Sequence, residues 1–348
     1  MKENDIFAQM ETKTETKDET EIILVSAGNF QEYILDNIKN LIDFNNHKIT
    51  VLTEEKFFPR FEEILKIFPK LSLIDVKTLD DLSFDKNSKL DRAFRGGFWH
   101  LCSLRLFYVY SYMNKYNLQN CVHIENDVTL YADVSTIKFN RNKLCGVLSA
   151  PGYIIPAVIY IPKPSMFKVV LDNYDFKKND MENLARFDET IIERLPIYTK
   201  LNTTPVTTMI TKNFSKYNII FDGSAMGQYL GGVDPSNISG DTRGFVNEIC
   251  KIQYNKNKFK WILNGNVYIP NIQINDVWYP IFNLHIHCKR LNRFMGRNPL
   301  ETKLITLDDK VKALEIKESK DSSSDRKVDA LEVKESEESN VLTDNAKS

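Results

Sequence analysis

The chain has 348 residues, of which 42% are hydrophobic and 27% charged, so a protein with an ordinary buried core is expected. No stretch approaches the roughly 18 consecutive apolar residues of a transmembrane helix, which argues against an integral membrane protein. The five cysteines form no CxxC pair, so a disulfide framework and a structural zinc site are not expected, and a reducing compartment, by default the cytoplasm, fits best.

The two ends of the chain are charged and poor in large apolar residues. Residues 1–20 have a net charge of −3 and no apolar stretch, so we expect a disordered tail without a signal peptide. Residues 308–348 have a net charge of −4, and we expect 301–348 to be mostly disordered as well. Since the whole chain has a charge of −1, +6 remains on residues 21–307, which suits a small anionic ligand but does not predict nucleic-acid binding.

Strand and helix patterns alternate after residue 20. Short apolar runs predict buried strands at 21–26, 48–53 and 71–76, and apolar residues at helical spacing predict helices near 33–42 and 61–68. This alternation is typical of βαβ units, which build a mainly parallel sheet flanked by helices. We therefore expect a Rossmann-like α/β fold, whose ligand would lie beyond the carboxyl ends of the strands.

The turn after the first strand lacks the usual nucleotide-binding fingerprints. It reads Ser26-Ala-Gly-Asn-Phe-Gln31 rather than GxGxxG, and the chain contains no GxxxxGK[ST] motif. Dehydrogenase-type dinucleotide binding and P-loop chemistry are therefore not expected. A nucleotide would have to be held in another way, and Gly28 is the candidate contact within this turn.

Two carboxylates follow an apolar strand in the middle of the chain. A helix containing Arg105 precedes Cys121-Val-His-Ile-Glu125, which reads as a central strand, and Asn126 and Asp127 come next. With the two-residue period of a strand, Glu125 and Asp127 would point to one face. Carboxylates placed in this way can bridge a divalent cation to the phosphates of a substrate.

Two later segments add candidate site residues. Residues 221–235 hold a concentration of glycines among polar residues, and glycine permits tight turns and close backbone approach to a ligand. Further on, His285, His287 and Lys289 would alternate along one face of a predicted strand. Three groups that bind metals or anions would then converge.

These segments resemble the GT-A glycosyltransferases. Residues 125–127 look like the DxD-type motif of that family, and 221–235 look like an acceptor-side segment of GT-A enzymes from bacteria and large DNA viruses. The resemblance covers roughly residues 21–295. Its main departure is the first acid, which is Glu125 rather than Asp, so Asp127 is the safer ligand.

The resemblance implies roles for individual residues. Asp127 would ligate Mn²⁺ or Mg²⁺ on the donor diphosphate, with Glu125 and Asn126 contacting the donor or the metal beside it. His285 or His287 would complete the metal site, and imidazole favours Mn²⁺ over Mg²⁺. Lys289 would contact the diphosphate, and Arg105 could reach a phosphate.

The resemblance implies a metal-dependent glycosyltransferase that moves a sugar from a nucleotide donor, with UDP as the nucleotide by analogy with the family, to a glycan, lipid-linked sugar or protein. Residues 21–135 would form its donor half and 136–300 its acceptor half. For an inverting reaction the candidate bases are Asp222 and, second, Glu248; a retaining reaction needs neither, and the sequence leaves both outcomes open. A sugar nucleotidyltransferase and a non-catalytic carbohydrate-binding or scaffold protein are the alternatives.

Overall fold

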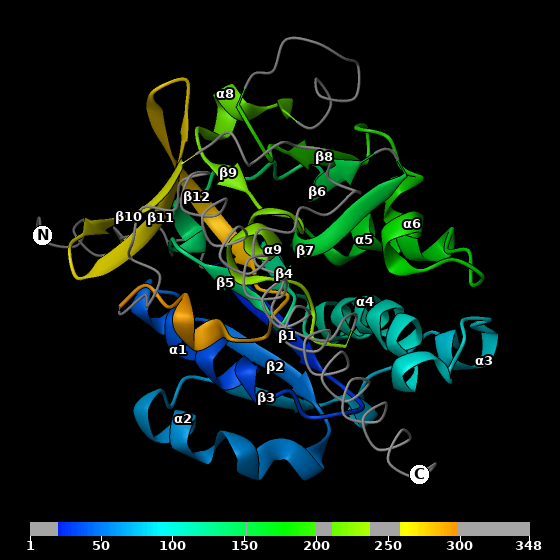
Figure 1. Cartoon of the computed structure of the whole chain (residues 1–348). Coiled ribbons are helices and arrows are strands. Elements are labelled where there is room, and N and C mark those ends of the chain that lie inside the picture. The colour runs from blue at the N-terminus through cyan, green and yellow to red at the C-terminus, as the bar shows by residue number, and fades with distance from the viewer. Residues whose placement is uncertain (1–19, 151, 200–210, 237–257, 298–348) are drawn as a thin grey trace, which may run out of the picture.

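The computed structural model describes residues 20–150, 152–199, 211–236 and 258–297. The two predicted tails, apart from Thr20, and the candidate base Glu248 lie outside these ranges. Within them the chain forms two sheets with helices around them (Figure 1).

The larger sheet has seven strands in the order β3-β2-β1-β4-β7-β6-β8. Strands β3, β2, β1 and β4 are parallel to one another, β7 runs antiparallel to both β4 and β6, and β8 is parallel to β6. The predicted α/β fold with a mainly parallel sheet is therefore confirmed, with β7 as the reversed strand. The strand bounds are β1 Glu21–Ser26, β2 Ile49–Thr53, β3 Ser72–Asp75, β4 Cys121–Ile124, β6 Leu144–Ala150, β7 Tyr153–Ile161 and β8 Ile192–Leu195.

The smaller sheet has the order β10-β11-β12-β5, with β9 parallel to β12 at its side. Strand β5 follows β4 in the chain, while β12 lies more than 140 residues later, and the two pair antiparallel with His285 opposite Val128. This pairing brings the segment after residue 284 to the end of β4. The bounds are β5 Val128–Leu130, β9 Ile220–Phe221, β10 Lys258–Asn264, β11 Val267–Ile274 and β12 Val277–His285.

Helices surround the larger sheet. Helix α4 packs on β1, α3, α5 and α6, and it is buried along most of its circumference. Helix α1 packs against β5 instead. The α-helices are α1 Tyr33–Asp43, α2 Glu62–Ile67, α3 Phe84–Asn87, α4 Phe98–Lys115, α5 Pro164–Asp172, α6 Asp180–Ala185, α8 Phe214–Tyr217 and α9 Met226–Gly231, and the 3₁₀ turns are η1 Glu55–Phe61, η2 Val76–Thr78, η3 Phe94–Gly96, η4 Val134–Thr136 and η6 Leu291–Arg293.

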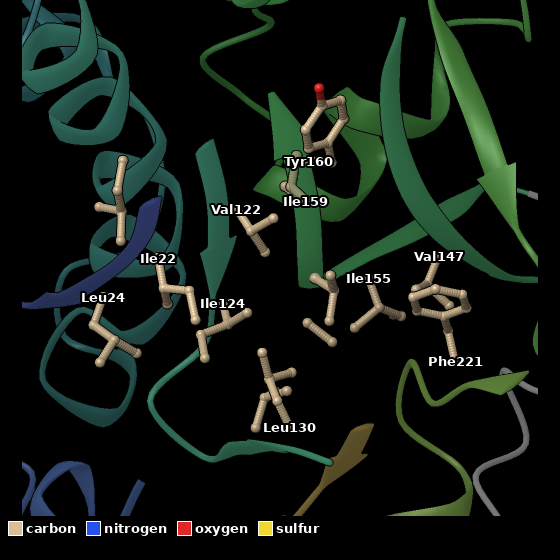
Figure 2. Close-up of a cluster of buried hydrophobic side chains, with 14 of the residues drawn as sticks. Ile22, Leu24, Val122, Ile124, Leu130, Val147, Ile155, Ile159, Tyr160 and Phe221 are labelled. Carbon is tan, nitrogen blue, oxygen red and sulfur yellow. The ribbon is translucent and has the colours of Figure 1, made fainter. Parts of the chain in front are cut away.

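The hydrophobic core is continuous from one sheet to the other. All six residues of β1 are buried, as expected for a central strand covered on both faces. Figure 2 shows Ile22 and Leu24 of β1, Ile124 of β4 and Leu130 of β5 in one cluster with side chains of β6, β7 and β9. Because β4 and β5 both contribute to this core, the short turn that joins them, residues 125–127, is anchored at both ends. Among the described residues, no helix is long and apolar enough to span a bilayer.

Candidate metal centre and ligand pocket

A cavity of about 710 Å³ lies at the carboxyl ends of β1 and β4. Cavities that hold small organic ligands have volumes of roughly 300–1,000 Å³. The cavity of this protein is lined by elements that lie far apart in the sequence, with lining residues that include Ala27, Trp99, Glu125, Asp180, Gln228 and Lys289. The position agrees with the sequence expectation, because the carboxyl ends of parallel strands are where α/β folds place their ligands.

Glu125, Asp127 and His285 form a cluster in the lining of this cavity. One potential ligand atom of each lies within 4.8 Å of those of the other two. Nε2 of His285 is 3.4 Å from Oε2 of Glu125 and 3.3 Å from Oδ2 of Asp127. The two carboxylates and the imidazole therefore surround one small space, as the ligands of a divalent cation would.

The backbone brings these groups together by turns rather than by strand pleating. Strand β4 ends at Ile124, and the amide of Val128 donates to the carbonyl of Glu125 at 3.0 Å across a tight turn. Strand β12 likewise ends at His285, and the amide of Ile286 donates to the carbonyl of Asp127 at 2.8 Å. The prediction that acids and histidines alternate along strands was therefore wrong about the local geometry, although it placed Glu125, Asp127 and His285 in one region.

A hydrogen bond to a backbone carbonyl orients the ring of His285. Its ring Nδ1 lies 2.6 Å from the carbonyl of Gly223, which can only accept, so Nδ1 carries a proton and Nε2 faces the carboxylates. Burial alone would lower the pKa of His285, but Asp127 and Glu125 raise it to about 9. A backbone carbonyl behind an imidazole is the usual support of a metal-binding histidine, since it leaves the other nitrogen free for the ion.

The donor set fits a divalent cation. Nε2 of His285 lies between two carboxylates, and the raised pKa means that a proton occupies this nitrogen when no cation is bound; a divalent cation would take the place of that proton. Oε2 of Glu125 is buried and accepts no hydrogen bond from the described residues. Two carboxylate oxygens and one imidazole nitrogen suit a divalent cation that accepts both oxygen and nitrogen ligands.

Lys289 lies at the edge of the cluster. Its ammonium forms an ion pair with Oδ2 of Asp127 and lies 3.8 Å from Oδ2 of Asp234. Burial would raise the pKa of Asp127, but Lys289 and His285 hold it well below its usual range. Lys289 has a left-handed backbone with φ of 60°, so it projects from a turn and not, as predicted, from a strand.

His287 is placed beside the cluster rather than in it. Its ring centroid is 4.0 Å from that of His285, and its Nδ1 lies 3.0 Å from Nε2 of Gln228. Burial and the positive charges of His285 and Lys289 hold the pKa of His287 well below its usual value. Of the two histidines, His285 is the one that the structure brings to the carboxylates.

Arg105 is turned toward carboxylates. Its Nη2 lies 2.6 Å from Oε1 of Glu125 and 2.7 Å from Oδ2 of Asp180. Although burial disfavours the charged form, the two acids hold the pKa of Arg105 well above its usual value. In this arrangement the guanidinium is compensated from within the protein, whereas the sequence predicted a contact with phosphate.

Asp222 does not have the surroundings of a catalytic base. It is 1% exposed and is absent from the cavity lining. Its oxygens accept hydrogen bonds from four backbone amides, those of Ala225 at 2.9 Å, Met226 at 2.9 Å, Gly227 at 2.7 Å and His285 at 3.0 Å. A carboxylate with this many donors positions the backbone around it, so the structure gives no support to the proton-transfer role expected from the sequence.

Gly28 and Asn126 shape the cavity wall. Gly28 has φ of +86°, and a Cβ there would lie 2.9 Å from Cδ1 of Leu101, so the turn after β1 requires glycine. Its neighbours Ala27 and Asn29 line the cavity. The side-chain amide of Asn126 donates to the carbonyl of Val25 at 2.7 Å, which ties the turn after β4 to the end of β1.

Sequence reasoning missed Asp180 and Asp234, which both line the cavity. Asp180 opens a six-residue helix in a segment without a recognisable motif. Asp234 lies in the glycine-rich stretch, where it pairs with Arg95 at 3.0 Å. The Asp-Pro pair at residues 234–235 was the one available signal for the second of them.

Gly227 provides a direct test of how the centre is built. A Cβ at this position would overlap the backbone carbonyl of His285. We therefore expect Gly227→Ala to displace His285 and to weaken Mn²⁺ binding about 10-fold or more, as loss of a ligand's support does. Electron paramagnetic resonance of free Mn²⁺ measures this affinity. Gly146→Ala is the control, because its Cβ would meet only side-chain atoms; equal Mn²⁺ affinity of the two variants would contradict the expectation.

No protein-family model matches this chain, and no curated protein matches it by sequence. Solved structures similar to it include the bifunctional glycosyltransferase WbbM in its apo form, with 12% identity, a TM-score of 0.36, and coverage of 56% of this chain and 40% of that one. A cytidylyltransferase from Leptospira borgpetersenii has 12% identity, a TM-score of 0.31 and coverage of 56% and 82%. The PaToxG glycosyltransferase has 12% identity, a TM-score of 0.32 and coverage of 48% and 64%.

The chain thus spans less than half of the WbbM structure. With TM-scores below 0.5, these likenesses do not assign a function to the chain. Its function has to follow from its own side chains.

Proposed function

We propose that this protein is a metal-dependent glycosyltransferase that uses a nucleotide-sugar donor. The observation that carries the proposal is the cluster of Glu125, Asp127 and His285 in the lining of a cavity at the carboxyl ends of β1 and β4. The cavity is large enough for a small organic ligand, and Lys289 adds a cation at its edge. This combination suits a ligand that contains a diphosphate.

Asp127 and His285 are assigned as metal ligands, with Glu125 as the third group. Mn²⁺ is the preferred ion, and when bound it would stabilise negative charge on the departing diphosphate. Lys289 would exchange its contact with Asp127 or Asp234 for a phosphate oxygen. The flanking turn at Gly28 and the amide of Asn126 would shape the nucleotide side of the cavity.

The rest of the assignment follows the sequence. Residues 21–135 are proposed as the donor half and 136–300 as the acceptor half, with UDP as the nucleotide and a hydroxyl of a glycan, lipid-linked sugar or protein as acceptor. Free cysteines at 102, 121, 145 and 288 are in keeping with a reducing compartment such as the cytoplasm. If the reaction inverts configuration, Glu248 is the remaining candidate base, since the carboxylate of Asp222 is engaged by backbone amides.

Donor cleavage tests this proposal. The protein would be incubated with a panel of nucleotide sugars with and without Mn²⁺, and the products separated by chromatography. We expect one donor to release its nucleoside diphosphate and free sugar, only when metal is present. Formation of sugar 1-phosphate and nucleoside triphosphate in the presence of pyrophosphate would instead identify a nucleotidyltransferase. Failure of the folded protein to bind or cleave any donor would favour a non-catalytic protein.

A further inference from the structure

The cavity contains a buried acid that the proposed function does not use. Asp180 is 1% exposed and lies at the start of α6, within the cavity lining. One of its oxygens accepts a hydrogen bond from the amide of Met181 at 3.0 Å, and the other accepts one from Nη2 of Arg105 at 2.7 Å. Burial raises the pKa of Asp180, but both donors favour its ionised form.

Asp180 and Glu125 both form an ion pair with the same nitrogen atom of Arg105. Nη2 of Arg105 lies between Oδ2 of Asp180 and Oε1 of Glu125, at 2.7 and 2.6 Å. Because Oε1 of Glu125 is occupied in this way, its other oxygen, Oε2, is the one that faces His285 at 3.4 Å. Arg105 therefore selects which oxygen of Glu125 is presented to the metal centre.

Charge explains why a second acid is needed. A buried guanidinium paired with Glu125 alone would neutralise that carboxylate and reduce its attraction for a cation. With Asp180 present, the three side chains have a net charge of −1, and the excess negative charge remains available at Glu125. Removing Asp180 would leave Arg105 paired with Glu125, and those two side chains together would have no net negative charge to offer the cation site.

The backbone around Asp180 is built to keep it in place. Asn179 and Glu182 form a capping box at the start of α6, in which the backbone amide of Glu182 donates to Oδ1 of Asn179 at 3.0 Å. The side-chain amide of Asn183 donates to the carbonyls of Asp175, Lys178 and Asn179, each at 3.0 Å. These hydrogen bonds fix the backbone on both sides of Asp180 and so hold its side chain in one position.

We propose that Asp180 is a positioning residue for the metal centre, acting through Arg105 to orient Glu125 and to preserve its charge. This inference rests on the proposed metal site. It assigns to Asp180 a role in metal affinity rather than contact with the reacting atoms.

A double-mutant cycle on Mn²⁺ affinity tests it. Asp180→Asn keeps the size of the side chain and removes its charge, and Arg105→Met keeps volume and removes the guanidinium. Free Mn²⁺ would be followed by electron paramagnetic resonance in the full-length wild type, both single variants and the double variant, each shown by circular dichroism to be folded. We expect Asp180→Asn to weaken Mn²⁺ binding about 10-fold in the wild-type background. In the Arg105→Met background it should change the affinity less than twofold.

The outcomes separate this inference from the metal site itself. If Asp180→Asn binds Mn²⁺ with wild-type affinity, or if it loses Mn²⁺ affinity equally in the wild-type and Arg105→Met backgrounds, the role of Asp180 is overturned while the metal site stands. Absence of Mn²⁺ binding by the wild type would contradict the metal site and, with it, the inference. Asp172→Asn, which removes an exposed partner of Lys168 on α5, is the matched control and should bind Mn²⁺ as the wild type does.

Discussion

Replacing Asp127 by Asn is expected to lower kcat/KM for donor cleavage by about 10³-fold, the loss seen when one group that stabilises charge in a transition state is removed. Asp127 faces both His285 and Lys289, so its neutral amide would weaken the metal site and release the lysine at once. Steady-state rates of nucleoside diphosphate release, measured at saturating Mn²⁺, check this result.

Asp172→Asn serves as the control for this prediction as well. Asp172 is exposed and pairs with Lys168 on the surface of α5, where ion pairs contribute little. Its rate should match that of the wild type. An Asp127→Asn variant that keeps more than about a tenth of the wild-type rate would show that this carboxylate does not take part in the reaction.

Replacing Asp222 by Ala is expected to destabilise the fold by about 3–5 kcal/mol, because buried backbone amides would lose their acceptor. The lost hydrogen bonds would destabilise both elements that Asp222 joins, the start of α9 and the end of β12. Urea unfolding followed by circular dichroism measures it, with the midpoint moving to lower urea at unchanged slope.

The same position separates a structural role from a catalytic one. Asp222→Asn keeps one acceptor oxygen, so it should be destabilised less than Asp222→Ala. Each variant, when folded, should lose activity only in proportion to its weakened Mn²⁺ binding. If Asp222→Asn has wild-type stability and Mn²⁺ affinity but no turnover, Asp222 is the catalytic base after all.

Much of the fold could be predicted because its signals are local. The strand predicted at 21–26 corresponds to β1, and those predicted at 48–53 and 71–76 correspond to β2 and β3 with ends differing by one residue. The helix near 33–42 corresponds to α1, with Ile34, Ile38 and Leu41 buried as their spacing indicates. The hydrophobic pattern suffices for such elements, since a buried strand is a short continuous apolar run and a helix with one buried face has apolar residues at helical spacing.

The site could be predicted only in part, because long-range pairing decides it. The triplet at 125–127 and the histidines at 285 and 287 were visible in the sequence, but their meeting depends on β12 pairing with β5. Choosing His285 over His287 requires the carbonyl of Gly223 behind its ring. No local pattern shows which residue that carbonyl will face.

The surroundings of Asp222 and Arg105 have a common physical basis. Asp222 and Arg105 were both interpreted as groups facing a substrate, because an acid among glycines and an arginine before an acidic motif are typical of such sites. In the fold the carboxylate of Asp222 accepts from backbone amides, and Nη2 of Arg105 pairs with Glu125 and Asp180. Buried charges require partners, and the partner of Arg105 on α6 lies 75 residues away in the sequence.

Anomalous diffraction at the manganese edge, from crystals grown with Mn²⁺ and a nucleoside diphosphate, tests the central claim most directly. We expect one strong peak between the carboxylates of Glu125 and Asp127 and Nε2 of His285, with the diphosphate extending from it toward Lys289. A peak elsewhere, or a diphosphate bound with no metal at these three side chains, would contradict it.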